Sequence, residues 1–314
     1  MLKVAVVGCG GISGVHVPAW ESFEDCELVA ICDVRPEMMA KYPGKRCYTD
    51  YKELLEKEEL DIVDICLPTY LHADYAVMAM EKGINVVCEK PISLNREDVA
   101  RVYGTAEKYG VKFMVAHVLR FWSEYKFVKE VYEKETYGKL LSGSMYRLGG
   151  FPKWTWDNWM SDEKRSGLTP YDLHIHDLDY MVYAFGKPKK AITHRSKLPD
   201  QDYIHAVYEY DGFFLTGEAS WYASCYPFGM RFRFQFEKAV IAMEHEGLKV
   251  YTDDGQTISV TGGAAEESGT INLPATNAYA DELEYFKNCV LSGADADIIK
   301  PEELECVIDI LNSF

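Results

Sequence analysis

The sequence predicts an α/β protein of two domains, in which a parallel sheet with helices on both faces precedes an α+β domain with a mostly antiparallel open sheet. Three observations support this prediction. At 314 residues the chain exceeds the size at which one hydrophobic core usually stops growing. Continuous apolar runs alternate with helical patterns over roughly the first 118 residues, and alternating strand patterns follow. We therefore expect domains at 1–118 and 119–314.

The strands of the first domain are expected where short apolar runs recur between helical patterns. These runs are Val4–Val7, Leu28–Cys32, Ile62–Leu67, Val86–Cys88 and Lys112–Val115. Strands that are apolar along their whole length are covered on both faces, which is typical of a parallel sheet. Pro18 lies about two turns into the first helix, where its missing N–H predicts a kink but not the loss of the helix.

The second domain has the pattern of hairpins. Its clearest alternating segments are Tyr203–Tyr210, Phe213–Trp221 and Met230–Phe236. The Asp211-Gly212 pair between the first two is a strong hairpin signal. We therefore expect a mostly antiparallel sheet, apolar on at least one face, with a small polar loop at Thr261–Thr270.

The composition is that of an ordinary globular protein, with 48% hydrophobic and 26% charged residues. The net charge of −17 disfavours binding to phosphate backbones or anionic lipid, so we expect neither nucleic acid nor a membrane as a partner. No segment approaches the roughly 20 apolar residues of a membrane span. Met1 leads directly into a strand pattern rather than a basic and apolar signal region, so we expect a cytoplasmic protein.

The nine cysteines include no Cys-x-x-Cys pair, and most lie in apolar runs such as Ile31-Cys32 and Val87-Cys88. This pattern favours small buried side chains over metal ligands or disulfides. His174 and His176 also invite a metal interpretation, but side chains two residues apart point to different faces of a helix. We therefore expect no metal site.

The first 33 residues carry the pattern of a dinucleotide-binding βαβ unit. An apolar strand pattern is followed by Gly8-Cys9-Gly10-Gly11-Ile12-Ser13, and Asp33 ends a second apolar run. Gly8 permits a tight turn, and Gly10 lets the backbone approach a pyrophosphate. Gly11, Ile12 and Ser13 open a helix whose first N–H groups and positive dipole end favour phosphate. Ser13 replaces the third glycine of the strict motif but is small.

Asp33 indicates which dinucleotide is used. It lies 20 residues after Ser13, as the fingerprint requires, and would accept hydrogen bonds from the adenosine ribose hydroxyls. A carboxylate there repels a 2′-phosphate, so NAD(H) is favoured over NADP(H). Arg35, two residues further on, offsets part of that repulsion, so NADP(H) stays open as a cofactor.

A third pattern, Cys88-Glu89-Lys90-Pro91, directly follows a strand. A lysine at the carboxyl end of a parallel strand points toward the edge where ligands of open α/β sheets bind. Pro91 rigidifies the turn and makes the preceding peptide bond a candidate for the cis form. The alternative is that Glu89 and Lys90 are an ordinary solvated pair of charges.

A helix with clear start and stop signals follows in the second half of the chain. Thr169 is the expected N-cap, Pro170 the first helical residue, and Gly186 follows the end. Asp172 and His176 are four residues apart and so meet on one face of an α-helix. An imidazole beside a carboxylate suits proton transfer near neutral pH. The alternatives are that Asp172 only completes a cap with Thr169, and that His176 is a buried structural histidine.

Together these segments resemble the glucose-fructose oxidoreductase, inositol dehydrogenase and rhizopine-catabolism (Gfo/Idh/MocA) family. The motifs that carry the resemblance, over nearly the whole chain, are Gly8 to Ser13 with His16, Pro68-Thr69-Tyr70-Leu71-His72, Glu89-Lys90-Pro91, Arg120-Phe121 and Asp172-x-x-x-His176-x-x-Asp179. The resemblance implies an N-terminal Rossmann fold and a C-terminal α/β domain whose open sheet often forms subunit contacts, hence a homodimer or homotetramer. It also accounts for Ser13, because a small residue other than glycine is common there.

Lys90 and His176 match the family's catalytic lysine and histidine, and Asp172 its accompanying acid. The resemblance thus implies an NAD-dependent oxidoreductase acting on a secondary alcohol of a sugar, polyol or cyclitol. His176 would remove the hydroxyl proton, Lys90 would stabilise the alkoxide and Asp172 would orient His176. One alternative is an NAD-dependent glycoside hydrolase that oxidises its substrate transiently. Another is a non-catalytic cofactor-binding sensor or co-repressor, which the presence of Lys90 and His176 disfavours.

Further roles concern cofactor and substrate contacts. The resemblance implies that Glu89 contacts the cofactor ribose and that Pro68 to His72 lie along the cofactor. His174 stands where many relatives carry glycine, and we expect it to add a bulky titratable group near the substrate.

The segment Phe151–Trp159 precedes the catalytic helix. Flat aromatic side chains beside polar groups, such as Trp154 and Trp156, suit the faces of a sugar or cyclitol. The alternative is that these tryptophans pack in the core or at a subunit interface. Arg120 and Lys153 are candidates for recognising an acidic substituent of the substrate.

Overall fold

The computed structural model describes residues 1–244, 247–260 and 277–314, which divide into two compact units. Met1–Val118 and Asn277–Pro301 form the first unit. The second unit contains residues 119–260 and Glu302–Phe314. Residues 277–301, which the sequence places in the second domain, therefore fold with the first. The polar loop expected at Thr261–Thr270 lies outside the described residues.

The first unit contains a six-stranded sheet in the order β3-β2-β1-β4-β5-β6, with every pair of neighbours parallel. The strands are β1 (Leu2–Val7), β2 (Cys26–Cys32), β3 (Arg46–Tyr48), β4 (Ile62–Ile65), β5 (Asn85–Glu89) and β6 (Phe113–Ala116). This is the strand order of a Rossmann fold, so the predicted fold of the first domain is confirmed. The short edge strand β3 was not predicted.

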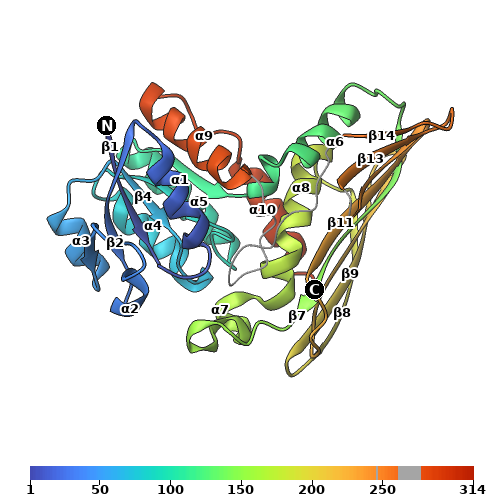
Figure 1. The fold of residues 1–314 in the computed structure, drawn as a ribbon. Helices are drawn as coiled ribbons and strands as arrows, with labels where there is room; N and C mark the ends of the chain where they lie inside the picture. Colours follow the sequence, from blue (N-terminus) through green and yellow to red (C-terminus); the bar gives the residue numbers. More distant parts are fainter. Residues whose placement is uncertain (245–246, 261–276) are drawn as a thin grey trace. The chain divides into compact units, whose positions relative to one another are not determined.

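Helices cover both faces of this sheet (Figure 1). They are α1 (Ser13–Ser22), α2 (Pro36–Met39), α3 (Tyr51–Lys57), α4 (His72–Met80), α5 (Arg96–Tyr109) and α9 (Ala278–Ser292), with the short turn η1 (Thr69–Leu71) before α4. Helix α1 is continuous through Pro18. Helix α9 packs on α1, and an ion pair of 2.9 Å joins Lys287 to Asp25. Long-range packing of this kind explains why residues 277–301 join the first unit.

The second unit is built on an eight-stranded sheet in the order β14-β13-β12-β11-β7-β10-β9-β8. Its strands are β7 (Leu140–Gly150), β8 (Lys190–Leu198), β9 (Gln201–Glu209), β10 (Phe214–Tyr222), β11 (Gly229–Phe236), β12 (Ala239–Glu244), β13 (Gly247–Thr252) and β14 (Thr257–Ser259). The pairing of β7 with β10 is parallel, and the other neighbouring strands pair antiparallel. The mostly antiparallel sheet is confirmed.

The predicted hairpin joins β9 to β10. Gly212 has a φ of 84°, and the Tyr210 N–H donates to the Phe213 carbonyl at 3.0 Å. The rings of Tyr210 and Phe213 stack with centroids 4.6 Å apart, which pins the register beside the turn.

Helices lie on one face of this sheet, as Figure 1 shows for α6 (Ser123–Glu133), α8 (Ile175–Phe185) and α10 (Pro301–Leu311). Side chains of β9 alternate between buried and partly exposed positions, as expected when only one face is covered by helices. The shorter helical segments are η2 (Val118–Arg120), η3 (Trp156–Ser161), α7 (Glu163–Ser166) and η4 (Pro170–His174).

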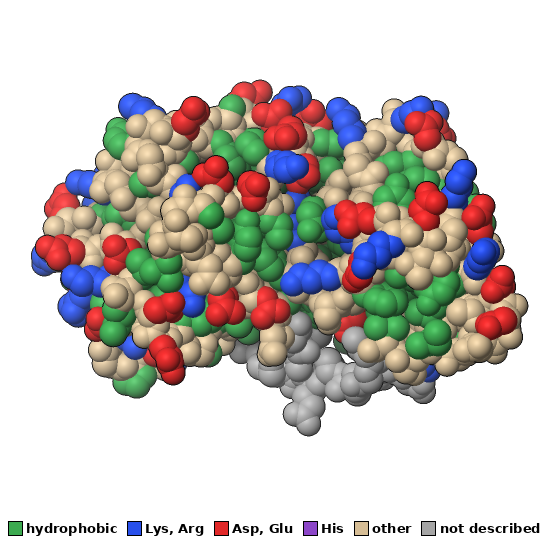
Figure 2. Space-filling view, turned by 90° about the horizontal axis from the view of Figure 1, so that it is seen from above, with side chains coloured by type: hydrophobic (Ala, Val, Ile, Leu, Met, Phe, Trp, Pro, Cys, Tyr) green, Lys and Arg blue, Asp and Glu red, His purple; other side chains and the backbone are tan. Residues whose placement is uncertain are grey.

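Charged side chains of both signs are interspersed on the face of the molecule that Figure 2 shows. Among the described residues, none of the helices is long and apolar enough to cross a membrane.

Candidate active site

The glycine loop leaves β1 through a turn that requires glycine. Gly8 has a φ of 96°, and a Cβ at this position would lie 2.4 Å from the carbonyl oxygen of Cys66. At Gly10, by contrast, a Cβ would meet nothing within 4 Å. The loop is therefore packed on β4 at Gly8 and open at Gly10, as the approach of a pyrophosphate requires.

Ser13 ties the loop to the start of α1. Its buried hydroxyl donates to the Gly10 carbonyl at 2.8 Å and forms a hydrogen bond of 3.0 Å with the Tyr42 hydroxyl. The Gly14 N–H donates to the Gly11 carbonyl, so the amides of Gly11, Ile12 and Ser13 precede the first donor of the helix. Such amides are the groups that bind phosphate at a helix N-terminus.

Asp33 follows β2 and is almost fully buried. Its Oδ2 accepts the Cys9 N–H at 2.8 Å, and its Oδ1 accepts the Arg35 N–H at 2.9 Å and the Arg35 Nε–H at 3.2 Å. The Lys41 ammonium donates to the Gly10 carbonyl at 3.3 Å. One carboxylate and two cations thus surround the open side of the loop, and these residues fit a nicotinamide dinucleotide.

Glu89, Lys90 and Pro91 lie at the carboxyl end of β5, and the Lys90–Pro91 peptide bond is cis. His72 joins this turn to the segment Pro68 to His72. Its Nδ1 lies 2.6 Å from the Pro91 carbonyl and its Nε2 lies 2.6 Å from the Leu67 carbonyl. Burial lowers the pKa of His72, although both carbonyl contacts favour the protonated ring. The two segments expected along the cofactor are therefore held together.

The helix that carries Asp172 and His176 differs from the prediction at its start. Pro170–His174 forms a π-helical turn, and the α-helix begins at Ile175. Thr169 stands at the predicted N-cap position with Pro170 at the start of the turn, but its side chain makes no capping hydrogen bond, because its hydroxyl donates to the Asp202 carbonyl at 3.0 Å. The Thr169 side-chain cap, one half of the capping arrangement offered as the alternative role of Asp172, is therefore not formed. π-turns are frequent at functional sites.

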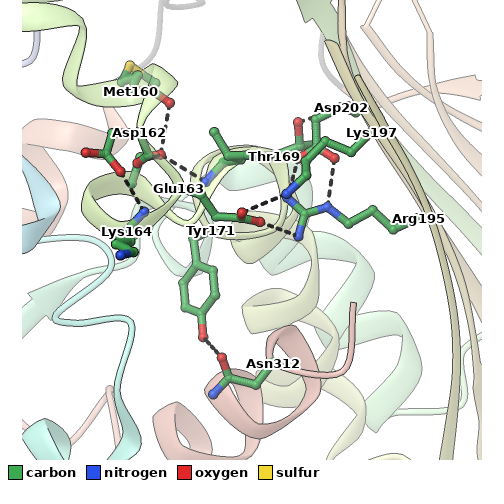
Figure 3. Close-up of polar contacts among 12 residues, drawn as sticks. Met160, Asp162, Glu163, Lys164, Thr169, Tyr171, Arg195, Lys197, Asp202 and Asn312 are labelled. Atoms are coloured by element: carbon green, nitrogen blue, oxygen red, sulfur yellow. Dashed lines mark hydrogen bonds and ion pairs between the residues drawn. The ribbon is translucent and has the colours of Figure 1, made fainter. Parts of the chain in front are cut away.

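A network of ions and hydrogen bonds anchors this turn (Figure 3). The Thr169 N–H donates to Asp202 Oδ2 at 3.1 Å, and Arg195 binds both oxygens of the same carboxylate at 2.8 and 2.9 Å. Arg195 also pairs with Glu163 at 3.1 Å. At the other side, the Tyr171 hydroxyl donates to Asn312 Oδ1 at 2.7 Å. The residues on either side of Pro170 are thus fixed to the sheet and to the C-terminal segment.

Between Tyr171 and Phe185 the side chains are buried except at three positions, which are partly exposed: Asp172, His176 and Tyr183. A buried helix that leaves a carboxylate and an imidazole accessible offers them to a ligand. The structure thus places these two predicted side chains at accessible positions of a rigid element.

Arg120 does not lie at an accessible position. Its side chain is fully buried and binds both oxygens of Asp179, with Nη2 at 2.6 Å from Oδ1, and it pairs with Glu303 at 2.6 Å. The Tyr183 ring lies 4.6 Å from the guanidinium. This geometry assigns Arg120 to the link between η2, α8 and α10 rather than to substrate recognition.

His174 is also buried, contrary to the expectation of a group near the substrate. Its Nε2 hydrogen-bonds the Tyr208 hydroxyl, and its ring lies in the space that a side chain at Gly217 would fill. Burial lowers the pKa of His174 to about 3, so the ring is neutral. It packs between the helix and the sheet.

The expected tryptophans lie at the surface of the second unit. Trp154 is 58% exposed and Trp156 41% exposed, which excludes the core alternative for both. Trp154 and Lys153 line a cavity of about 500 Å³ together with Phe151, Tyr222, Ser224 and Cys225. Lys153 also pairs with Asp200 at 3.2 Å.

Two buried ion pairs were not predicted as part of the site. His16 contacts Asp64 in the first unit, and Arg147 contacts Asp177 at 2.9 Å in the second. Charged residues inside apolar strand patterns, such as Asp64 between Val63 and Ile65, were the available signal.

Comparison with known proteins matches both halves of the chain to models of one family. Residues 2–117 match the family model described as "Oxidoreductase family, NAD-binding Rossmann fold", and residues 125–242 match the "GFO/IDH/MocA C-terminal domain". The chain belongs to the GFO/IDH/MocA family.

Several curated GFO/IDH/MocA relatives are enzymes of carbohydrates and cyclitols by name. A 2,7-anhydro-N-acetylneuraminate hydratase of Mediterraneibacter gnavus is 29% identical over 60% of this chain and 50% of its own length. A D-glucoside 3-dehydrogenase of Escherichia coli is 29% identical over 60% and 55%. A myo-inositol 2-dehydrogenase of Thermotoga maritima is 33% identical over 61% and 57%. The matched part of the chain thus spans about half the length of these relatives.

Solved structures share this fold over nearly the whole chain. An oxidoreductase from Agrobacterium radiobacter, in complex with NAD+, L-tartaric acid and magnesium, superposes with a TM-score of 0.83 at 19% identity, over 99% of this chain and 94% of that one. A levoglucosan dehydrogenase in complex with NADH and levoglucosan gives 0.82 at 19% identity, over 99% and 95%. At these identities the likeness establishes the fold alone.

Proposed function

We propose that this GFO/IDH/MocA protein catalyses the reversible NAD(H)-dependent oxidation of a secondary alcohol of a sugar, polyol or cyclitol. One observation carries the proposal: along a mostly buried helical segment, Asp172 and His176 are two of the three partly exposed residues, and Tyr183 is the third. The same chain has Lys90 at the carboxyl end of β5, at the sheet edge that carries the glycine loop. Proton-handling groups are what an alcohol oxidation needs besides its cofactor.

The dinucleotide would be held by the first unit. The amides of Gly11, Ile12 and Ser13 would bind the pyrophosphate, and Asp33 would accept from the adenosine ribose hydroxyls. Glu89 and the segment Pro68 to His72 would lie along the nicotinamide half. When bound, the cofactor supplies hydride acceptance or donation.

Three side chains would manage the proton and the charge of the substrate. His176 would take the hydroxyl proton, because imidazole is the side chain best suited to proton transfer near neutral pH. Lys90 would place a positive charge beside the alkoxide as it forms. Asp172 would orient His176, which is four residues away across the change from π-turn to α-helix.

The proposed substrates are cyclic polyhydroxy compounds. The cavity lined by Trp154, Lys153 and Tyr222 supports this class, because aromatic faces and polar groups bind the two kinds of surface of a sugar. The relatives named D-glucoside 3-dehydrogenase and myo-inositol 2-dehydrogenase also favour it. Lys153 stays a candidate for an acidic substituent. Arg120 is not proposed as a substrate contact, because its guanidinium is buried among carboxylates.

A second candidate is a redox-neutral reaction in which the substrate is oxidised transiently and NADH does not accumulate. The relative named 2,7-anhydro-N-acetylneuraminate hydratase favours it, as its name is not that of a dehydrogenase. The protonatable groups would be the same. Product analysis separates the two, because the redox-neutral reaction changes the substrate without net NADH.

We also propose a homo-oligomer that buries the sheet face without helices. Phe214, at the start of β10, is 48% exposed, and Tyr203 and Val207 on β9 are partly exposed. Sedimentation would detect the assembly.

The test of the proposed function is a screen of sugars, inositols and their keto forms with NAD(H) and NADP(H), followed by the nicotinamide absorbance. On the substrate so found, Lys90→Met and His176→Gln should each lower kcat by about 10²-fold or more and leave NADH binding within about threefold. Lys108→Met, at an exposed position of α5, is the matched lysine control. Wild-type turnover in both site variants would refute the assignment.

A further inference from the structure

A chain of buried polar groups runs from α1 to the end of β5 within the first unit. His16 is fully buried, and its two ring nitrogens face carboxylates of two neighbouring strands. Nδ1 lies 2.8 Å from Asp64 Oδ2 on β4, and Nε2 lies 3.2 Å from Glu89 Oε1 at the end of β5. The imidazole therefore stands between two acids.

Asp64 is held in place by three donors. Besides His16, the indole N–H of Trp20 donates to Oδ2 at 2.7 Å, and the Cys66 thiol donates to Oδ1 at 3.6 Å. Burial raises the pKa of the Cys66 thiol, so it stays a donor. The Asp64 end of the chain is a fixed anchor with no exposed surface.

Glu89 forms the other end of the chain. Its Oε2 accepts the Lys90 N–H at 3.1 Å, and 11% of its side chain is exposed. The His16 ring thus contacts one oxygen of the Glu89 carboxylate. The other oxygen accepts the backbone N–H of Lys90, the proposed catalytic lysine.

The geometry favours a charged imidazole. The hydrogen bond to Asp64 uses Nδ1, whereas the contact of Nε2 with Glu89 Oε1 at 3.2 Å has the distance of an ion pair without the geometry of a hydrogen bond. An ion pair with Glu89 requires the doubly protonated, positively charged ring. Burial alone would lower the pKa of His16, but Asp64 and Cys66 together outweigh it and raise that pKa well above its ordinary value. Burial alone would raise the pKa of Glu89, but His16, Lys90 and His72 together outweigh it and lower that pKa.

His16, Asp64 and Cys66 also have the residue types of a metal site, with ligand atoms within 4.8 Å of one another. The contact of 2.8 Å between His16 and Asp64 is shorter than the roughly 3.3 Å that separates two ligands of a tetrahedral zinc ion. That distance is normal for a hydrogen bond. We therefore interpret the group as a proton-linked network.

We propose that His16 is a positioning residue: a buried imidazolium, anchored by Asp64 and Trp20, that keeps the Glu89 carboxylate charged and fixed beside Lys90. The inference rests on the proposed function, in which Glu89 meets the cofactor ribose. Without the imidazolium, the buried Glu89 carboxylate loses the cation that contacts its Oε1, and the carboxyl takes up a proton although Lys90 follows it in the chain. A protonated Glu89 loses its charge-assisted contact with a ribose hydroxyl.

The test compares NADH binding by wild type and His16→Gln over about pH 6 to about pH 9. Wild-type affinity should be flat, because the pKa of Glu89 lies below this range. The variant should bind at least roughly tenfold more weakly near pH 6 and should recover as the pH rises and Glu89 ionises. If His16→Gln lost the same amount of NADH affinity at every pH, His16 would have a merely structural role, and the proposal would be overturned.

Two further variants test whether His16 affects NADH binding through Glu89. Glu89→Gln should bind NADH weakly at every pH, and the double variant with His16→Gln should bind no more weakly than Glu89→Gln alone. Lys108→Met, at an exposed position of α5, is the surface control. If the losses of NADH affinity in the two single variants added up in the double variant, the proposal would be contradicted.

Other groups face this network. Cys66 faces His16 from the end of β4, and the Tyr279 ring of α9 lies 6.4 Å from the imidazole. His72 and Lys90 act on Glu89. Each of these groups is unchanged in the variants, so differences between variants report on His16 and Glu89.

Nitrogen NMR of the wild-type histidines decides the charge without any variant. Both His16 ring nitrogens should carry protons at neutral pH, and a neutral His16 would overturn the proposal. If wild type binds no NADH, the proposed function fails, whereas the nitrogen shifts still report on His16. If NADH binds equally to wild type and His16→Gln at every pH, only the present inference fails.

Unfolding gives a second readout that needs no cofactor. Because the pKa of His16 is raised, its contribution to stability is complete below its unfolded value of 6.5 and is lost as the pH rises through the folded value. Because the pKa of Glu89 is lowered, its contribution is complete above 4.5 and is lost as the pH falls. The stability difference between wild type and His16→Gln should be largest between pH 4.5 and 6.5. A difference that does not change with pH would count against the charged pair.

Discussion

At the scale of residues, cofactor choice depends on how Asp33 is neutralised. Its carboxylate already accepts the Cys9 N–H and three N–H groups of Arg35, so its charge is partly balanced within the first unit. Lys41 adds a second cation at the Gly10 carbonyl. An isolated acid would exclude a 2′-phosphate, whereas an acid paired with arginine excludes it less strongly.

We predict that Arg35→Ala lowers kcat/KM with NADP(H) by roughly tenfold and leaves kcat/KM with NAD(H) within about twofold. The reason is that the remaining Asp33 carboxylate would repel a 2′-phosphate and still bind the ribose hydroxyls. Steady-state kinetics with both cofactors measure this ratio. Arg101→Ala, an exposed arginine of α5, is the control. Equal losses with both cofactors would contradict the role given to Arg35.

Sequence reasoning found the residues whose roles depend on local geometry and missed those that depend on distant partners. Gly8, Ser13 and Asp33 follow from spacing along the chain. Arg120 looked like a substrate contact because its acids are 59 and 183 residues away in the sequence. Ion pairs between distant segments leave no periodic signal.

At the scale of elements, the helical segment that carries Asp172 and His176 packs on its sheet through complementary shapes. A Cβ at Gly217 on β10 would lie 2.3 Å from His174 Cε1, and the imidazole is confined by the Tyr208 ring at 5.9 Å and the Phe314 ring at 5.6 Å. Glycine is therefore required at position 217 because a side chain there would collide with His174, and not because of the backbone conformation of a turn. His174 fills the gap that it leaves.

We predict that Gly217→Ala lowers the free energy of unfolding by about 1–3 kcal/mol, because the methyl group overpacks a site that cannot relax. Denaturant unfolding would measure the change. Adding His174→Ala should restore part of the lost stability, since the two side chains compete for one space. Unchanged stability in Gly217→Ala would show that the imidazole moves aside freely.

Periodicity predicted the strands and helices well where burial sets the pattern, as in β1, β5 and the β9–β10 hairpin. It missed the π-helical turn before α8, because Asp202 takes the hydrogen bonds of Thr169 and this competition is invisible in the sequence. It also missed β3, which has three residues and is mostly exposed.

At the scale of the whole molecule, the chain joins a dinucleotide-binding unit to a sheet that supports a rigid, accessible Asp172 and His176. Family models match both parts, which identifies the family. The helix α9 belongs to the first unit although it follows most of the second unit in the sequence, so neither unit is a continuous segment. The single domain boundary predicted from the sequence pattern could not assign residues 277–301 to the first unit.

The central claim is that hydrogen passes between a substrate CH–OH carbon and the nicotinamide. We propose to react wild type with NAD+ and a polyol that is deuterated at the oxidised carbon, and to measure the deuterium in the cofactor by mass spectrometry. We predict one deuterium per NADH formed, with the rate lowered about 10²-fold or more in His176→Gln. Ketone formation without deuterium in NADH, or an unchanged rate in that variant, would contradict the claim.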